Sequence, residues 1–158
     1  GDRVRPGPSR RSKEISLIME KSLLPMLDLS KFAGSVIEVY VELLQTDAGT
    51  RCAAITAASM ALADAGIPMK DLVTAVACGR VEDQLIVDVD YIEDSAEDGV
   101  DLPVAMSTNT GEITLLQMDG VLDPKSLKKL LELTKKACAD IKVVQIAALR
   151  EKYLGGAQ

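Results

Sequence analysis

Residues 50–65 place the strongest constraint on how this chain can fold. Alanine and other apolar residues occupy nearly every position around the helix that this segment would form. A helix that is apolar on most sides has to be buried, and its alanines allow close approach to a sheet. Gly66 then fits the position just past the helix end, and Pro68 follows as a second stop signal. We therefore expect a buried helix over residues 50–65.

The elements around this helix predict a sheet covered by helices. We expect a helix from about residue 12 to the high twenties, a half-buried strand over 35–45, short strands near 73–81, 84–90, 102–108 and 112–118, and a long final helix. Apolar and acidic residues alternate along 35–45, which is typical of a strand with one buried face. Thr108 to Gly111 form a hairpin turn signal, and Asp123-Pro124 fit the N-cap and first position of the last helix. This order predicts an α+β or mixed α/β fold, a sandwich of helices on a mixed, largely antiparallel sheet.

The composition excludes several kinds of chemistry. The chain has 158 residues, the size of one domain, and no histidine, so Ser-His-Asp and Cys-His catalysis and the usual zinc sites are ruled out. Its three cysteines are odd in number and far apart, which predicts neither a CxxC pair nor a disulfide framework. Aromatic residues make up 3% of the chain, which argues against DNA or RNA recognition by base stacking. No apolar run reaches the ~18–20 residues of a membrane span, and no signal-peptide pattern opens the chain, so we expect a cytoplasmic protein away from membranes.

Charge is distributed unevenly along the chain. Residues 1–13 hold five basic residues against Asp2 alone, although the net charge of the whole chain is −6. Residues 82–101 hold nine carboxylates and neither lysine nor arginine. The basic segment can therefore attract phosphate, and the acidic segment can hold a proton or a metal ion.

The first candidate site is the start of the expected central helix, at residues 47–51. A helix N-terminus offers unpaired amides and a partial positive charge, which together suit an anion. Gly49 lets the backbone approach a ligand, the Thr50 hydroxyl can donate to a phosphate oxygen, and Arg51 can pair with it bidentately. The alternative is structural: Asp47 or Thr50 simply caps the helix, and Arg51 is solvated.

A second guanidinium for the same anion can come from the N-terminal segment. Residues 1–12 contain Pro6, Gly7 and Pro8, which predict a non-helical basic arm that ends with Arg10 and Arg11. The remainder, 13–158, is expected to form one domain. The alternative for the arm is a disordered basic tail.

The second candidate site is the acidic segment from Asp94 to Asp101, between two expected strands. A carboxylate held protonated there can act as a general acid, and two ionised carboxylates can bind Mg²⁺ or Mn²⁺. The alternative is a solvated turn. Cys52, at the start of an alanine-rich helix and without a base, is expected in the core rather than as a nucleophile.

Five stretches of the sequence occur in the order and spacing of one known family. They are residues 8–11 leading into a helix, 44–51, 61–69, 87–94 and 101–106. Together they resemble the RNase PH superfamily of phosphorolytic 3′→5′ exoribonucleases and, within it, the catalytic subunits of the archaeal exosome. The resemblance implies the RNase PH-like sandwich fold, the one also described as ribosomal protein S5 domain 2-like. It also implies that this chain corresponds to the C-terminal portion of such a subunit, without its N-terminal strands.

The resemblance implies a role for each residue of the first site. Arg11, Thr50 and Arg51, with the amides after Gly49, fall on family positions that hold inorganic phosphate, the co-substrate. Arg10 falls on a position that contacts the RNA backbone, as Arg11 also does.

The resemblance assigns the two carboxylates as well. Asp94 falls on the general acid, and Asp101 falls on a second carboxylate that helps to place a divalent ion, Mg²⁺ or Mn²⁺. The interval between them is one residue longer than in the relatives. The resemblance therefore defines the partner of Asp101 less closely than it defines the role of Asp94.

The function that the resemblance implies is phosphorolysis of single-stranded RNA to nucleoside diphosphates, with RNA tailing as the reverse reaction. The implied partners are a homologous inactive subunit, alternating in a hexameric ring, and RNA-binding cap subunits. Two alternatives stay open: a non-catalytic scaffold of the ring, and the tRNA 3′-end-trimming member of the superfamily.

Overall fold

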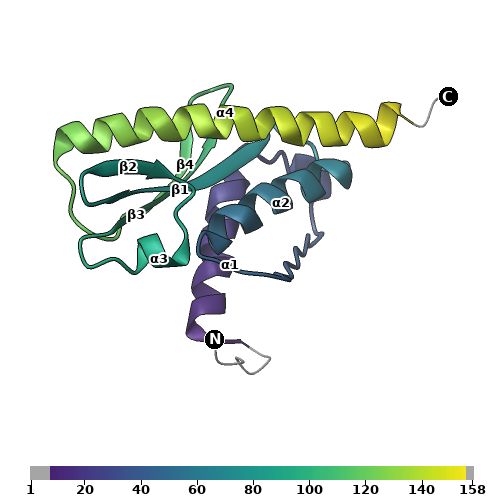
Figure 1. The fold of residues 1–158 in the computed structure, drawn as a ribbon. Coiled ribbons are helices and arrows are strands. Elements are labelled where there is room, and N and C mark those ends of the chain that lie inside the picture. The colour runs from purple at the N-terminus through teal and green to yellow at the C-terminus, as the bar shows by residue number, and fades with distance from the viewer. Residues whose placement is uncertain (1–7, 156–158) are drawn as a thin grey trace.

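The structure is a computed structural model that describes residues 8–155, in which helices cover both faces of one sheet (Figure 1). The helices are α1 (Arg10–Leu23), α2 (Thr50–Asp64), α3 (Tyr91–Asp94) and α4 (Pro124–Leu154), with 3₁₀ turns at Leu24–Met26 and Ser30–Phe32. The strands are β1 (Val73–Val81), β2 (Gln84–Val87), β3 (Val100–Ser107) and β4 (Ile113–Leu116). The predicted sandwich of helices on an antiparallel sheet is confirmed.

The four strands lie in the order β2-β1-β3-β4, and each neighbouring pair is antiparallel. β1 and β3 form the centre of the sheet, with Val73 opposite Ser107 and Gly79 opposite Asp101. The predicted turn at residues 108–111 joins β3 to β4. This central pair is the frame from which the site residues described below extend.

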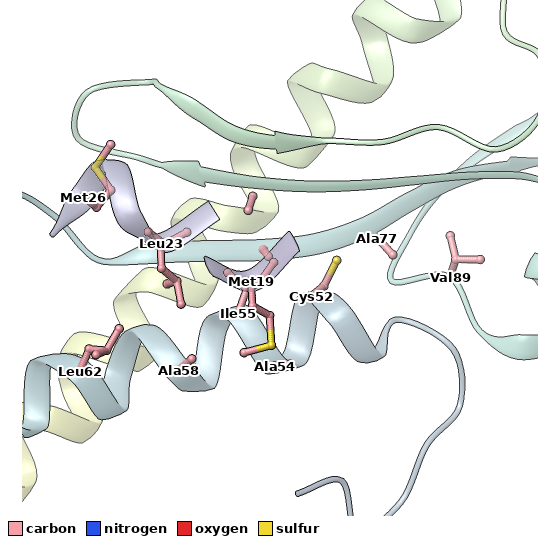
Figure 2. Packing of buried hydrophobic residues seen from close by; sticks show 13 residues of the cluster. Met19, Leu23, Met26, Cys52, Ala54, Ile55, Ala58, Leu62, Ala77 and Val89 are labelled. Atoms are coloured by element: carbon pink, nitrogen blue, oxygen red, sulfur yellow. The ribbon is translucent and has the colours of Figure 1, made fainter. Parts of the chain in front are cut away.

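Alternate residues of β1 serve two different cores. Val73, Ala75 and Ala77 pack with α1 and α2 on one face of the sheet. Figure 2 shows this cluster, in which Met19 and Leu23 of α1 lie over Ile55 and Ala58 of α2. The small β1 side chains let α2 lie close to the sheet, as the alanine-rich segment predicts.

The other face of the sheet is covered by α4, which runs along its full length in Figure 1. Val76 and Cys78 of β1 pack there with Leu130 and Cys138 of α4. The helix begins as predicted, because the Asp123 carboxylate accepts from the amides of Lys125 and Ser126. None of the helices that the structure describes combines the length and the apolar run that a membrane span requires.

Residues 35–45 do not form the predicted strand, although their alternate apolar side chains still face the same way. Ile37, Val39, Val41 and Leu43 face α1 and α2 across an apolar cavity of about 520 Å³. The backbone of the segment pairs with no strand of residues 8–155. A strand needs the hydrogen bonds of a neighbour, so residues with strand periodicity form only an extended segment here.

Two further expectations need correction. α2 is not buried on every side, since Ala53, Ala57 and Ala61 are exposed at four-residue spacing; leaving a methyl group in water costs little. The expected arm of residues 1–12 ends earlier, because Ser9 caps α1 and Arg10 and Arg11 are already helical. Residues 1–7 of the arm lie outside the described residues.

Candidate active site

One cavity of about 360 Å³ lies where α1, α2, α3 and the β3–β4 edge meet. Its lining residues are Arg11, Glu14, Ala48, Gly49, Thr50, Arg51, Ala77, Asp94, Asp101, Pro103, Gln117, Met118 and Asp119. The lining combines two guanidinium groups with four carboxylates. The structure thus brings both candidate sites of the sequence into a single cavity.

The backbone at the start of α2 is open toward this cavity. Ala48 and Gly49 both have positive φ, 54° and 57°, so the chain makes a tight left-handed entry to the helix. Gly49 is the N-cap, and no side chain caps the helix. Within the described residues, the amides of Thr50 and Arg51 donate to no acceptor. Such free amides at the positive end of a helix dipole favour an anion.

The structural alternative for this segment is therefore wrong in its main part. Neither Asp47 nor Thr50 caps α2. Asp47 instead accepts a hydrogen bond of 3.1 Å from the amide of Tyr91, the first residue of α3. This contact joins the α2 entry to the element that carries Asp94.

Arg51 is held rather than solvated, with 23% of its side chain exposed. Its Nη1 atom donates to Oε1 of Gln117 at 2.5 Å and lies 3.9 Å from Oε1 of Glu14. Arg11, on the first turn of α1, also lines the cavity but is exposed. Arg10 is exposed and does not line the cavity, so the structure does not bring it together with the others.

Asp94 and Asp101 were expected in a loop, but both lie in regular secondary structure. Asp94 is the exposed last residue of α3, a one-turn helix, and Asp101 is the half-buried second residue of β3. A capping box starts α3, in which Asp90 and Glu93 each accept from the other's amide. The expected loop is therefore confined to residues 95–99, and the two carboxylates lie at its borders, Asp94 at the end of α3 and Asp101 in β3.

Burial raises the pKa of Asp101, and the neighbouring charge of Asp94 raises it further, with Arg51 opposing both effects and Asp119 adding to them. The Oδ1 atom of Asp101 is buried and has no hydrogen-bond partner among the described residues. A desolvated carboxyl beside other carboxylates is one that takes up a proton or a cation readily.

The residues present fit a divalent ion of the Mg²⁺ or Mn²⁺ type. Asp94 and Asp101 offer carboxylate oxygens to one cavity, and one of those oxygens is unpartnered. Within residues 8–155, no three carboxylate or cysteine side chains are grouped so that they could hold an ion by themselves. Mg²⁺ is often held by one or two carboxylates with substrate phosphates and water, which is the arrangement that this cavity allows.

Three polar lining residues were not predicted from the sequence: Glu14, Gln117 and Asp119. Gln117 and Asp119 reach the cavity through pairing with β3, since Gln117 N donates to Pro103 O at 3.1 Å and Asp119 N to Asp101 O at 2.8 Å. No local pattern identifies such residues, because only the register of the sheet places them.

Cys52 is a core residue, as expected. It is buried among apolar side chains, and burial raises the pKa of its thiol to about 12. A thiol with such a pKa is almost wholly protonated near neutral pH and is a poor nucleophile. All three cysteines are free and buried, so the absence of a disulfide framework is also confirmed.

Comparisons with known proteins place this chain in a family. The sequence matches the 3′ exoribonuclease family, domain 1, over residues 1–68 and domain 2 over residues 71–137. Proteins named exosome complex component Rrp41 are 48% identical over 98% of the chain in Nitrosopumilus maritimus and 51% identical over 96% in Methanosarcina mazei. The chain covers 63% and 30% of those two proteins, respectively.

A solved structure shows the same fold at much lower identity. The crystal structure of rice Rrp46 matches 92% of this chain, with a TM-score of 0.76 and 19% identity, and the match covers 69% of the rice chain. Two consecutive domain matches, close relatives over nearly the whole chain and a shared fold agree with one another. This chain belongs to the RNase PH family of 3′ exoribonucleases.

Proposed function

We propose that this chain carries the active site of a phosphorolytic 3′→5′ exoribonuclease that acts on single-stranded RNA. The observation that supports this most is the single cavity in which an uncapped helix N-terminus and two arginines lie with two carboxylates. The first set suits inorganic phosphate, and the second suits a proton donor and a divalent ion. A chain without histidine has no imidazole to activate water, which favours phosphate as the nucleophile.

In the proposed reaction, Arg11, Arg51 and the amides of Thr50 and Arg51 hold inorganic phosphate. One phosphate oxygen attacks the phosphorus that joins the last nucleotide to the RNA. A new P–O bond forms, the bond to the 3′ oxygen of the preceding nucleotide breaks, and a nucleoside diphosphate leaves. Positioning and neutralisation of charge supply most of the catalysis in such an in-line displacement. One phosphoric anhydride is formed as one phosphodiester is broken, so the same site can run in reverse and add tails.

Asp94, or a water molecule that it positions, delivers the proton to the departing 3′ oxygen. Its exposure in the cavity leaves it accessible to RNA, whereas Asp101 is half-buried in β3. Burial and then the charge of Asp94 raise the pKa of Asp101, so the charge state of Asp101 depends on that of its neighbour. A divalent ion bound by this pair would supply neutralisation of the negative charge on the leaving oxygen. Arg10, exposed on the first turn of α1, is proposed to contact the RNA backbone outside the cavity.

The relatives named as exosome components support a further part of the proposal, which concerns assembly. We infer that the chain works as the catalytic subunit of a hexameric archaeal exosome ring, beside a homologous inactive subunit and under RNA-binding cap subunits. A scaffold subunit needs neither phosphate-binding residues nor a proton donor, yet both sets of proposed residues line one cavity in this chain.

The nucleophile provides the test. In the assembled complex that contains this chain, RNA degradation should require inorganic phosphate and release nucleoside diphosphates, resolved by chromatography. Arg51→Gln should raise the phosphate concentration needed for half-maximal rate by at least about tenfold, because it removes a charge-assisted contact. Monophosphates as the main product in phosphate-free buffer would contradict the proposal.

A further inference from the structure

Gln117 lies directly after β4, and its backbone is fixed to the neighbouring strand. Its amide donates to the carbonyl of Pro103 at 3.1 Å. Two residues later, Asp101 and Asp119 exchange amide-to-carbonyl hydrogen bonds of 3.0 and 2.8 Å. The backbone of Gln117 is therefore fixed by its own bond to β3 and by the paired residue Asp119 that follows. Both bonds join it to the strand that carries Asp101.

The side chain of Gln117 reaches across the cavity to α2. Its Oε1 atom accepts the 2.5 Å hydrogen bond from Nη1 of Arg51, a contact between residues 66 positions apart. A carboxylate also lies near that guanidinium, since Oε1 of Glu14 is 3.9 Å from Nη1, on a side chain that is 53% exposed. Gln117 is thus the closer and the less exposed of the two anchors. A guanidinium has five N–H donors, so this bond leaves most of them free for a ligand.

The chemical identity of the anchor matters in this cavity. Four carboxylates already line it, those of Glu14, Asp94, Asp101 and Asp119. A fifth carboxylate against Arg51 would neutralise the cation and compete with an anionic ligand. An amide oxygen orients the guanidinium through a dipole and adds no negative charge to that of Glu14, which already lies 3.9 Å from Nη1.

We propose that Gln117 is a positioning residue for the anion at this site. It holds the Arg51 guanidinium in one orientation with a neutral acceptor, so that the remaining donors face inorganic phosphate and no further negative charge is added beside Glu14. This inference rests on the proposed function, in which phosphate is the anion bound between Arg51 and the start of α2.

The test compares Gln117→Met and Gln117→Glu with the wild type in the assembled complex, with inorganic phosphate as the varied substrate. Gln117→Met is close in size and removes the acceptor, so the KM for phosphate should rise about tenfold while kcat changes less than about threefold. Gln117→Glu keeps an acceptor but adds charge, so its KM should rise further. Gln84→Met, the same change on an exposed residue of β2, serves as the control and should leave both constants unchanged.

A calorimetric titration with inorganic phosphate gives the same comparison without turnover. If Gln117→Met or Gln117→Glu lowers the melting temperature, Gln117→Asn replaces it. This variant keeps the amide but is one methylene shorter, so it withdraws the acceptor from Arg51 with less effect on packing. A KM for phosphate within twofold of the wild-type value in these variants would overturn the role of Gln117 alone. If Gln117→Met and Gln117→Glu lowered kcat equally and left the KM for phosphate unchanged, the role would also be overturned. A wild-type complex that degrades RNA without phosphate would instead overturn the proposed function, and this inference with it.

Discussion

Asp94 and Asp101 are chemically identical side chains that the structure places in different surroundings. Asp94 is exposed at the end of α3, whereas Asp101 is half-buried in β3 with an unpartnered oxygen. Burial raises the pKa of Asp101, so protonation of Asp101 costs less than that of a solvated aspartate. Exposure gives Asp94 access to a large substrate such as RNA. Position in the fold, rather than residue type, separates their proposed roles.

Asp94→Asn tests the proposed proton donor. This nearly isosteric change should lower kcat by at least about a hundredfold, because removal of a general acid typically costs 10²–10⁴ in rate. RNA binding and assembly, followed by gel shift and native mass measurement, should persist.

Asp98→Asn is the matched control, four positions further along the same acidic segment and exposed. It should change kcat less than about threefold, as expected of a surface charge. Comparable losses in both variants would mean that the segment acts through its collective charge, and Asp94 would lose its assigned role.

At the scale of elements, the site depends on how closely β1 and β3 approach. Gly79 of β1 lies opposite Asp101, and there is no room for a side chain at this position. A Cβ atom at Gly79 would clash with the carbonyl oxygen of Val100 and would lie 2.7 Å from Cγ2 of Val89. The strand pair that carries Asp101 therefore needs glycine here for space, not for an unusual φ.

Gly79→Ala should push β3 away from β1 and displace Asp101. Overpacking of this kind typically costs about 1–3 kcal/mol, so the midpoint of urea unfolding should fall and activity should fall with it. Both can be measured on the same preparations.

Gly34→Ala separates lost stability from a displaced site. Gly34 has φ of +76° and nothing within 4 Å of a built Cβ atom, so alanine there costs about 1–2 kcal/mol of backbone strain. This variant should lose stability but keep its kcat. Equal losses of kcat in the two variants would mean that activity follows overall stability rather than the position of Asp101.

At the scale of the whole molecule, one buried polar network joins the sheet to α4. Asp71, just before β1, forms an ion pair with Lys142 of α4. The same carboxylate accepts from the Ser107 hydroxyl at 2.5 Å and from the Asn109 amide at 3.2 Å, at the β3–β4 turn. Burial by itself would raise the pKa of Asp71, but these hydrogen bonds, chiefly from Lys142, outweigh it and hold the pKa below its usual value.

Asp71→Asn should destabilise the protein strongly, because it leaves the Lys142 charge buried and unpaired, at a typical cost of about 3–5 kcal/mol. The double variant Asp71→Leu with Lys142→Met should lose much less, since no buried charge remains. Urea unfolding at pH 7 measures both. A double variant as unstable as the single one would show that packing, not charge, accounts for the loss.

The lowered pKa of Asp71 also predicts a pH dependence. A carboxyl whose pKa is lower in the folded state stabilises the fold above its unfolded value of about 3.9 and loses that contribution as the pH falls through the folded value. The stability of the wild type should therefore drop below about pH 4 more steeply than that of the double variant.

The elements that could be predicted from the sequence are those with local signals. The alanine-rich run with its Gly66 stop indicates α2, the Asp123-Pro124 cap indicates α4, and the strand predicted at 73–81 coincides with β1. The helix α3 also has a local signal, the capping box of Asp90 and Glu93, which was missed because one turn lies between two apparent strands. Caps and periodicity act within a few residues, so they can be recognised without the fold.

Features that depend on residues far apart in the sequence were decided by the tertiary structure. Residues 35–45 have the periodicity of a strand, but no strand of the described residues pairs with them. Arg51 could be identified as an anion-binding candidate from its place after Gly49, whereas its anchor, Gln117, is set by the pairing of β3 with β4 and the chain beyond it. The sequence by itself determined α1, α2 and α4, most of the strands and the site residues at the start of α2. Only the assembled sheet brought Asp101, Gln117 and Arg51 into one cavity, because hydrogen-bonded register is a property of two strands and not of either one.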